Sequence, residues 1–222
     1  MTRAFLQAQR ISRTFPGPPE VEALRRASLA MDLGERVTIL GKSGSGKSTL
    51  MNILGLLDAP DGGKYHLGGV DTSTLSNRGL DGVRARDLGF VFQAFHVLGH
   101  KSVYENVNLK LATVGTPRAV RREVIEAALS QVSLAHRISS PARLLSGGEK
   151  QRLAIARAIV GRPRVIFADE PTGNLDPETA AEVRTLLSTL AETGIAVLVI
   201  SHDPDMAAWA DRRLTLIDGV LE

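Results

Sequence analysis

The sequence predicts an α/β protein in which a mainly parallel core sheet follows an N-terminal antiparallel β subdomain and is interrupted by an inserted helical subdomain. Three observations predict this fold. A glycine-rich loop stands between an apolar strand and a helix, and short apolar runs alternate with helical patterns near the C-terminus. A long stretch of helical periodicity separates these two regions. Strands that alternate with helices are typical of a parallel sheet covered on both faces.

Length and composition suit a globular protein without disulfides. The chain has 222 residues, of which 43% are hydrophobic, so one or two domains with a sizeable core are expected. Cysteine is absent, which excludes disulfides and thiolate metal sites and fits a reducing cytoplasm. The 27 basic and 24 acidic residues give a net charge of +3, a near balance that predicts no nucleic-acid partner.

The apolar segments of the chain are too short to predict a membrane span. Residues 1–10 lack the apolar core of a secretory signal. The most apolar run, residues 195–200, is far shorter than the roughly 20 residues that a transmembrane helix needs. We therefore expect any membrane role to depend on a partner protein.

The N-terminal segment, residues 5–32, has irregular apolar alternation. It is interrupted by prolines between residues 16 and 19, so we expect short antiparallel strands joined by a proline-rich loop. Phe15 lies at the edge of that loop. Taken alone, such an aromatic residue is more often part of a core.

The glycine-rich loop that follows has the pattern of a phosphate-binding P-loop. It consists of Gly41, Lys42, Ser43, Gly44, Ser45, Gly46, Lys47, Ser48 and Thr49. Glycines allow consecutive backbone N–H groups to converge on a phosphate chain, while Lys47 would reach the β- and γ-phosphates and Ser48 would ligate Mg²⁺. The apolar strand 37–40 and the helix 49–54 on either side supply the context that distinguishes this motif from a chance glycine turn.

Further along, the pattern changes from strands to helices. We expect a turn at 58–63, a short strand at 64–67 and an apolar strand at 88–92 that ends at Gln93. Residues from 104 to about 160 have helical spacing. In this stretch the expected apolar face consists of Val120, Val124, Ala127, Ala128, Leu129 and Val132, and the charges opposite it are assigned no binding role.

A second helix N-terminus near the end of that region is a candidate anion site. Ser146, Gly147 and Gly148 stand directly before a long apolar helical pattern, so backbone N–H groups at the start of the helix could receive a phosphate. The alternative is an ordinary N-cap, in which the Ser146 hydroxyl satisfies those N–H groups.

The α/β pattern then resumes to the end of the chain. An apolar strand at 165–168 precedes Asp169 and Glu170, and a helix is expected from about Pro177 to Glu192. The strand 196–200 precedes His202, and a helix around 207–210 and a strand at 213–217 close the chain.

Together these motifs resemble the ATP-binding cassette (ABC) ATPases over nearly the whole chain. The stretch from Leu145 to Glu149 resembles the ABC signature, and the strand ending at Asp169 and Glu170 resembles the Walker B motif. Gln93 matches the Q-loop, Asp176 the D-loop, and His202 the switch histidine. The run from 169 to 176 is similar to the subgroup of lipoprotein-releasing, macrolide-export and cell-division ATPase subunits.

The resemblance implies a P-loop NTPase fold of the ABC ATPase type, in one nucleotide-binding domain over residues 1–222. Residues 1–92 and 161–222 would form the RecA-like core with its antiparallel β subdomain. Residues 93–160 would form the helical subdomain that carries the signature.

The same resemblance assigns chemical roles around an ATP and a Mg²⁺ ion. Asp169 would hold Mg²⁺, aided by Ser48 and Gln93, and Glu170 would deprotonate the attacking water, although two adjacent carboxylates could instead cap the next segment. His202 would contact the γ-phosphate, although a lone histidine near a turn is more often a surface residue. Phe15 becomes a candidate to stack on the adenine.

The signature would complete the nucleotide site of another copy. One chain has one P-loop and one signature, so Ser146, Gly147, Gly148 and Glu149 are expected to close over the ATP of a partner, and two chains should form a homodimer in the ATP-bound state. Asp176 would tie the two copies together.

The resemblance further implies an ATPase that powers export or lipoprotein release through separate integral membrane (permease) subunits, on the inner face of the cytoplasmic membrane. Ala94 and Gly99 depart from the subgroup pattern on the surface expected to meet such a subunit. One alternative is an ATPase that regulates cell-wall hydrolysis during cell division. A DNA-repair or translation ABC protein is a further alternative, against which stand the lack of a long coiled coil and of a second cassette.

Overall fold

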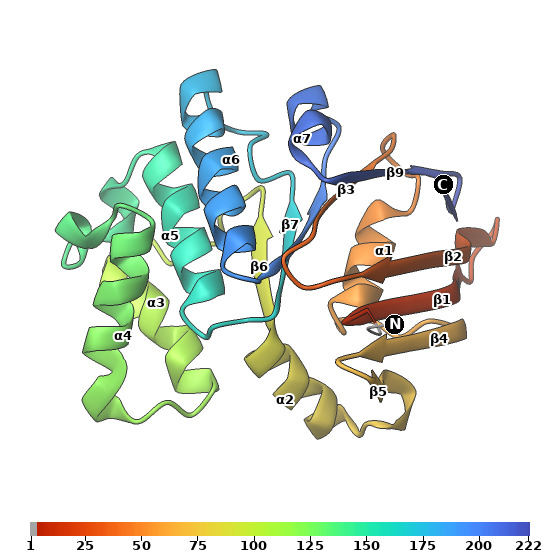
Figure 1. Cartoon of the computed structure of the whole chain (residues 1–222), viewed down its shortest axis with the longest axis horizontal. Coiled ribbons are helices and arrows are strands. Elements are labelled where there is room, and N and C mark those ends of the chain that lie inside the picture. The colour runs from red at the N-terminus through yellow and green to blue at the C-terminus, as the bar shows by residue number, and fades with distance from the viewer. Residues whose placement is uncertain (1–3) are drawn as a thin grey trace.

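A computed structural model of the chain describes residues 4–222, so residues 1–3, with which the expected domain begins, lie outside the described part. Two sheets and seven α-helices make up these residues. In Figure 1 the helices α3, α4 and α5 stand at one side of the molecule, the strands β1, β2 and β4 at the other, and β6 and β7 between them.

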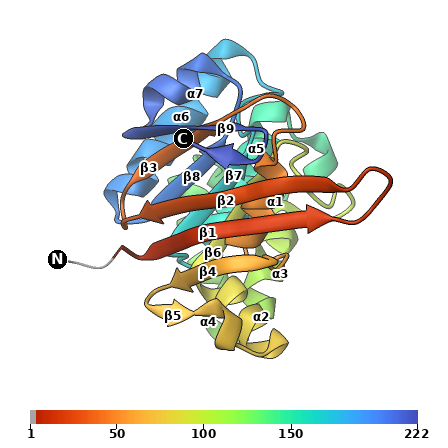
Figure 2. The same cartoon turned by 90° about the vertical axis from the view of Figure 1, so that its right-hand side faces the viewer.

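The N-terminal sheet is antiparallel, as the sequence predicts. It consists of β1 (Leu6–Phe15), β2 (Val21–Met31), β4 (Gly62–Leu67) and β5 (Val70–Asp71), in the order β2-β1-β4-β5. Figure 2 shows β2, β1 and β4 running side by side across this face. β1 and β2 have 10 and 11 residues, so they are longer than the short strands that the irregular alternation indicates. Shifts of register between them explain why the alternation is irregular.

The second sheet has six strands in the order β10-β9-β3-β8-β7-β6. Its members are β3 (Arg36–Leu40), β6 (Leu88–Phe92), β7 (Val165–Asp169), β8 (Ala196–Ile200), β9 (Arg212–Ile217) and β10 (Val220–Leu221). All neighbouring pairs are parallel except β9 with β10. The loops that leave β3, β8 and β7 therefore emerge side by side at one edge of the sheet.

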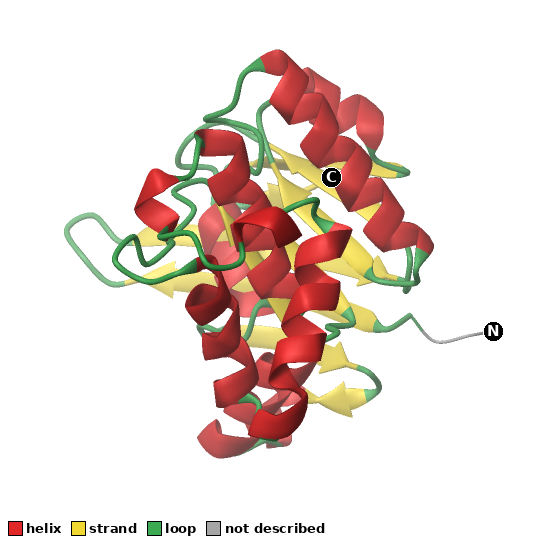
Figure 3. Cartoon of the chain, turned by 90° about the vertical axis from the view of Figure 1, so that its left-hand side faces the viewer, coloured by secondary structure: helices red, strands yellow, loops and turns green. Residues whose placement is uncertain are grey.

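The α-helices are α1 (Lys47–Leu54), α2 (Asn77–Asp87), α3 (Val103–Thr113), α4 (Arg118–Gln131), α5 (Gly147–Ile159), α6 (Pro177–Glu192) and α7 (Pro204–Trp209). Short 3₁₀ turns lie at Thr72–Thr74, Ala135–Arg137 and Ala142–Leu144. Figure 3 shows several of these helices crossing in front of the sheets. Among the described residues, no helix combines the length and the apolar character that a membrane-spanning helix needs.

Two details of the helices differ from the sequence prediction. The last helix begins at Pro204 rather than near residue 207, because Asp203 caps it by accepting a hydrogen bond from the backbone N–H of Asp205. In α4 the buried side chains are Ile125, Ala128 and Leu129, while Val120 is 43% exposed. The apolar face is therefore narrower than expected, and its first turn projects into solvent.

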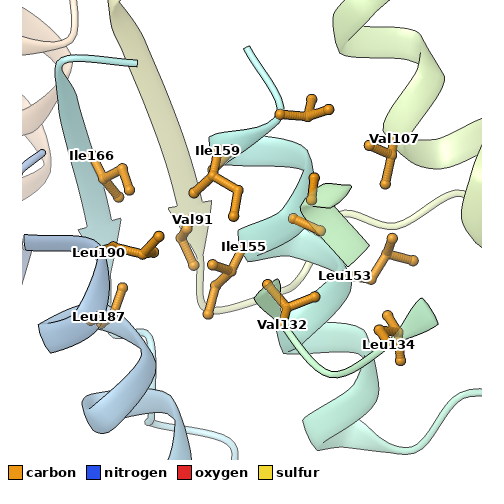
Figure 4. Close-up of a cluster of buried hydrophobic side chains, with 14 of the residues drawn as sticks. Val91, Val107, Val132, Leu134, Leu153, Ile155, Ile159, Ile166, Leu187 and Leu190 are labelled. Carbon is orange, nitrogen blue, oxygen red and sulfur yellow. The ribbon is translucent and has the colours of Figure 1, made fainter. Parts of the chain in front are cut away.

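Two apolar clusters fill the two faces of the core sheet. Alternate residues of β7 enter different clusters, with Ile166 in one and Val165 and Phe167 in the other. Figure 4 shows that Ile155 and Ile159 of α5 lie among the residues of the first cluster, near Ile166 of β7 and Leu187 of α6. The helix that carries the signature is thus packed directly on the core sheet, while the boundary of a helical subdomain at residues 93–160 stays a prediction.

Candidate functional site

The glycine-rich loop, Asp169, Glu170 and His202 come together because three neighbouring strands end at the same edge. β8 pairs with β3 on one side and with β7 on the other. The glycine-rich loop leaves β3, Glu170 follows β7, and His202 follows β8 by one residue. In parallel α/β sheets, ligands bind at the carboxyl ends of the strands. This edge is therefore the candidate functional site.

The glycine-rich loop needs its glycines for backbone reasons. Gly46 has φ of 101° and Gly44 φ of 82°, in the left-handed region where a side chain is strained. A Cβ atom on Gly46 would also collide with the Ala23 carbonyl oxygen. At Gly41 a Cβ atom would lie 2.5 Å from the Leu216 carbonyl oxygen. The loop thus passes too close to neighbouring backbone for larger residues.

Helix α1 starts without a side-chain cap. Its N-cap residue is Gly46, which offers no side chain to the first N–H groups of the helix. The Lys47 ammonium donates hydrogen bonds to the carbonyl oxygens of Gly41 and Lys42, both at 2.7 Å, and so lies across the loop. Positive charge and uncapped N–H groups are the features that make a helix N-terminus a candidate anion site.

The remaining loop residues differ in exposure. Ser48 is exposed and Thr49 half-buried, while Lys42, Ser43 and Gly44 face solvent. Ser45 is 7% exposed, and its hydroxyl has no hydrogen-bond partner among the described residues. The predicted phosphate-binding positions are therefore mostly accessible to a ligand.

Asp169, the last residue of β7, has a perturbed carboxyl group. Burial raises its pKa, the neighbouring Glu170 charge raises it further, and the Lys47 ammonium opposes both effects. The ionised carboxylate therefore lacks sufficient positive charge around it. A cation bound nearby would supply that charge.

Glu170 is held by the residues that end β8. Its φ of 45° is unusual for a residue with a side chain, and its N–H donates to the Ile200 carbonyl oxygen at 2.8 Å. His202 contributes two contacts to Glu170 Oε1, from its backbone N–H at 3.1 Å and from its ring Nδ1 at 2.6 Å. The Ser201 hydroxyl donates to Glu170 Oε2 at 2.9 Å.

Ser201 is a residue of this site that the sequence analysis did not assign. The available signal was its position, because it directly follows an apolar strand in the same way that Glu170 follows Asp169. Its position at the end of a strand did not indicate that the side chain is fully buried, with 0% of its surface exposed.

Gln93 lies beside the segment that follows Glu170. The Gln93 carbonyl oxygen accepts a hydrogen bond from the Asn174 side chain at 3.0 Å, and Gln93 Nε2 is 3.1 Å from the position of a Cβ atom on Gly173. The side chain of Gln93 is exposed. The predicted Q-loop is therefore next to the predicted catalytic segment.

Asp176 and Phe15 have partners within the chain. Asp176 caps α6, accepting hydrogen bonds from the Thr179 N–H at 3.0 Å and the Thr179 hydroxyl at 2.7 Å, which lower its pKa. Phe15 is 39% exposed, and the Arg13 guanidinium lies 5.0 Å from the centre of its ring. The stacking of Phe15 on a purine stays a prediction.

The signature forms a complete capping box at the start of α5. The Ser146 hydroxyl accepts a hydrogen bond from the Glu149 N–H at 3.2 Å, and the Glu149 carboxylate accepts one from the Ser146 N–H at 2.8 Å. Arg137 also donates to Glu149 at 2.9 Å. The capping interpretation is correct for the chain by itself. Ser146 is exposed, and its side chain also makes a hydrogen bond that contributes to lowering the pKa of Glu149.

The beginning of α5 packs against the segment around Asp176. A Cβ atom on Gly148 would lie 2.5 Å from the Thr179 methyl group, and one on Gly147 would lie 3.8 Å from Leu175. Gln151, fully buried, donates from Nε2 to the Pro171 carbonyl oxygen at 2.6 Å. Gln151 was not among the predicted site residues, although a polar residue within the apolar stripe of a helix was a signal.

The oxygen atoms at this edge suit a hard divalent cation. Asp169 offers a carboxylate, Ser48 a hydroxyl and Gln93 an amide oxygen, the ligand types that Mg²⁺ prefers together with phosphate oxygens. Within residues 4–222, no group of three or more His, Cys, Asp or Glu side chains is arranged to hold a metal ion.

Comparisons with known proteins identify the family to which these motifs belong. Residues 24–173 match the ABC transporter family. The macrolide export ATP-binding/permease protein MacB of Chlorobium luteolum is 44% identical over 221 residues, which are 99% of this chain and 33% of that protein. The pyoverdine export ATP-binding/permease protein PvdT of Pseudomonas aeruginosa is 45% identical over 203 residues, 91% of this chain and 31% of that protein. The chain spans about a third of the length of these relatives.

Solved structures agree with this match. The dimeric structure of MJ0796, a bacterial ABC transporter cassette, has a TM-score of 0.88 and 35% identity, covering 98% of this chain and 96% of that chain. A second dimeric structure of that cassette, in a post-hydrolysis state bound to ADP and Pi, has the same TM-score of 0.88.

Proposed function

Because the chain belongs to the ABC transporter family, we propose that it binds and hydrolyses ATP and that this reaction drives export through membrane-spanning partner subunits. The observation that carries the proposal is the convergence of the Lys47 loop, Asp169 and the Glu170–His202 pair at one sheet edge. Positioning and electrostatic stabilisation supply most of the catalysis of phosphoryl transfer.

The glycine-rich loop binds the phosphates of ATP in this proposal. Backbone N–H groups from Gly41 to Thr49 surround the phosphate chain, and Lys47 exchanges its contacts with the Gly41 and Lys42 carbonyl oxygens for contacts with phosphate oxygens. Phe15 stacks on the adenine. The left-handed conformations of Gly44 and Gly46 support this role, since they bring the backbone close to a ligand.

Asp169, Ser48 and Gln93 would hold Mg²⁺, and the ion would supply positive charge beside the phosphates when bound. The raised pKa of Asp169 supports this assignment, because a bound cation would stabilise the ionised carboxylate.

Glu170 and His202 perform the proton chemistry. Glu170 accepts a proton from the attacking water, and its carboxylate is held for this by donors on both oxygens. His202 is 75% exposed on its side chain and contacts Glu170 with one ring nitrogen, so the ring can also reach a ligand at the open side of the site. We assign it to the γ-phosphate.

The active unit is a homodimer with ATP between the two copies. In each site Ser146, Gly147, Gly148 and Glu149 of one copy close over the nucleotide held by the loop of the other, and Asp176 contributes to the contact between copies. The dimeric structures of the MJ0796 cassette support this arrangement. The dimer binds permease subunits at the inner face of the cytoplasmic membrane, and the exported substrate crosses the membrane through those subunits. The relatives named for macrolide and pyoverdine export support an export role.

The substitution Glu170→Gln tests the proposed reaction. It removes the base while leaving the phosphate-binding loop intact, so ATP binding should persist while hydrolysis slows by about 10²–10⁴-fold. With ATP present, light scattering should report a stable dimer. Glu123→Gln, an exposed carboxylate on α4, is the matched control and should behave as wild type. A Glu170→Gln protein with undiminished turnover would contradict the role of Glu170.

A further inference from the structure

A buried hydroxyl group lies against the Glu170 carboxylate. Ser201 is the first residue after β8, has 0% of its surface exposed, and places its Oγ 2.9 Å from Glu170 Oε2. Its own backbone N–H donates to the Ile39 carbonyl oxygen at 3.2 Å. The ends of β8 and β3 therefore fix the Ser201 backbone, and with it the position of the hydroxyl.

The direction of the hydroxyl proton is also determined. The backbone N–H of Asp203 donates to Ser201 Oγ at 3.1 Å, so one lone pair of the hydroxyl oxygen is occupied. Asp203 is in turn held by its role as the N-cap of α7, where it accepts a hydrogen bond from Asp205. With one acceptor position filled from α7, the Ser201 proton is directed toward the carboxylate.

The two side chains that contact the Glu170 carboxylate differ in their surroundings, and the His202 backbone N–H is a third donor, to Oε1. The His202 side chain is 75% exposed and, under the proposed function, turns toward the γ-phosphate. Ser201 is buried and cannot leave its place without disturbing β8. Glu170 itself has an unusual backbone conformation, with φ of 45°. The Ser201 hydroxyl therefore remains as a side-chain donor to its carboxylate when the His202 ring turns away.

We propose that Ser201 is a positioning residue that keeps the Glu170 carboxylate oriented toward the attacking water while His202 is engaged with the nucleotide. This inference rests on the proposed ATP hydrolysis. Hydrogen bonds to charged groups in water-excluded sites are among the stronger ones, so loss of this donor should be visible in the rate of the chemical step.

The experiment compares Ser201→Ala with Ser201→Thr in single-turnover hydrolysis at saturating ATP and Mg²⁺. Ser201→Ala should lower the rate by about 10–100-fold, while the dissociation constant for ATP stays unchanged. Ser201→Thr keeps the hydroxyl and should restore most of the rate. The separation of rate from affinity is the signature of an interaction that matters for the transition state.

Two controls separate positioning from stability. Thr38→Val removes another fully buried hydroxyl, which donates to the Met206 carbonyl oxygen at 3.0 Å and does not touch Glu170. It should lower the melting temperature and leave the rate unchanged. Ser201→Ala added to Glu170→Gln should cause no further loss, because the carboxylate that Ser201 orients is already gone. This double variant decides the question even if Ser201→Thr does not fold.

An unchanged rate in Ser201→Ala would overturn the proposal, as would an equal loss in the Glu170→Gln background or in Thr38→Val. A wild-type protein that does not hydrolyse ATP would instead contradict the proposed function. The two failures are therefore distinguishable in the same assay.

Discussion

Two helix N-termini in this protein are predicted to bind phosphate, and they are built in opposite ways. Helix α1 begins after Gly46, which has no side chain and so leaves the helix without a side-chain cap. Helix α5 begins after Ser146, and a capping box with Glu149 already satisfies its end. The first terminus also carries the Lys47 ammonium, whereas the second carries a carboxylate paired with Arg137.

The difference indicates a division of labour. An uncapped helix end beside a positive charge binds an anion by itself, because its N–H groups have no other partner. A capped end beside a carboxylate can add only to a phosphate that is already held. The Ser146 hydroxyl would then exchange its contact with Glu149 for one with that phosphate. We therefore expect α1 to determine affinity in the single chain and α5 to act only when another copy brings the nucleotide.

Lys47→Ala should have the largest effect, because it breaks the α1 side of this comparison. Loss of a charge-assisted contact to phosphate should weaken ATP binding by at least about tenfold and bring hydrolysis to background. Fluorescent-nucleotide titration would measure this affinity. The control is Lys64→Ala, an exposed lysine on β4. Wild-type affinity in the Lys47→Ala protein would rule out the assigned role of Lys47.

Ser146→Ala tests the α5 side. ATP binding to the single chain should be unchanged, while hydrolysis falls about tenfold or more because the hydroxyl that we propose to contact the partner's nucleotide is lost. Loss of the cap should also cost about 1 kcal/mol of stability. Ser102→Ala is a matched control, since Ser102 and Glu105 form the same capping box on α3. The Ser102→Ala protein should lose similar stability and keep full activity. An equal loss of activity in both variants would mean that Ser146 acts only as a helix cap.

Asp169→Asn should have opposite effects on stability and on function at the site beside α1. Burial and the Glu170 charge raise the pKa of Asp169, so its ionised form is disfavoured in the folded chain relative to the unfolded chain. Stability is therefore lost as pH rises above its ordinary value of 3.8. In the absence of nucleotide and Mg²⁺, the neutral asparagine should raise the melting temperature, by about 2–4 °C for each 1 kcal/mol gained. In a separate assay with ATP and Mg²⁺, hydrolysis should be lost. A lower melting temperature would contradict this account.

The smallest effect concerns the two capping boxes in acid. The Ser102 N–H lowers the pKa of Glu105 to about 2, and the Ser146 N–H followed by Arg137 lowers the pKa of Glu149. Each carboxylate therefore adds stability above pH 4.5 that disappears as pH falls toward its folded pKa. Glutamine at either position should flatten the acid limb of a plot of melting temperature against pH. An unaltered limb in both variants would show that these carboxylates do not determine acid stability.

Much of this architecture could be predicted from the sequence, including the ABC ATPase fold and family, which are confirmed. Strong apolar runs such as Val165–Asp169 and Ala196–Ile200 are buried strands, and α6 has the predicted bounds Pro177–Glu192. Helix α2 was missed because none of its residues is buried and two glycines interrupt it, so it has no apolar stripe to detect. Strands β5 and β10 have two residues each, too few for a periodic pattern.

The site residues were predictable as types but not as contacts. Glycines, Lys47 and the carboxylates after β7 are positions whose chemistry depends on spacing along the chain. The Ser201–Glu170 and Gln151–Pro171 hydrogen bonds join residues 31 and 20 positions apart, so only the packed fold brings them together. The assigned catalytic and binding roles remain predictions.

A mixing experiment tests most directly whether α1 of one copy and α5 of another form one site. Equal amounts of Lys47→Ala and Ser146→Ala protein should exchange into heterodimers in which one site has an intact Lys47 loop and an intact signature. ATP hydrolysis by the mixture should exceed the mean of the two variants measured alone. A mixture whose activity equals that mean would contradict the shared site.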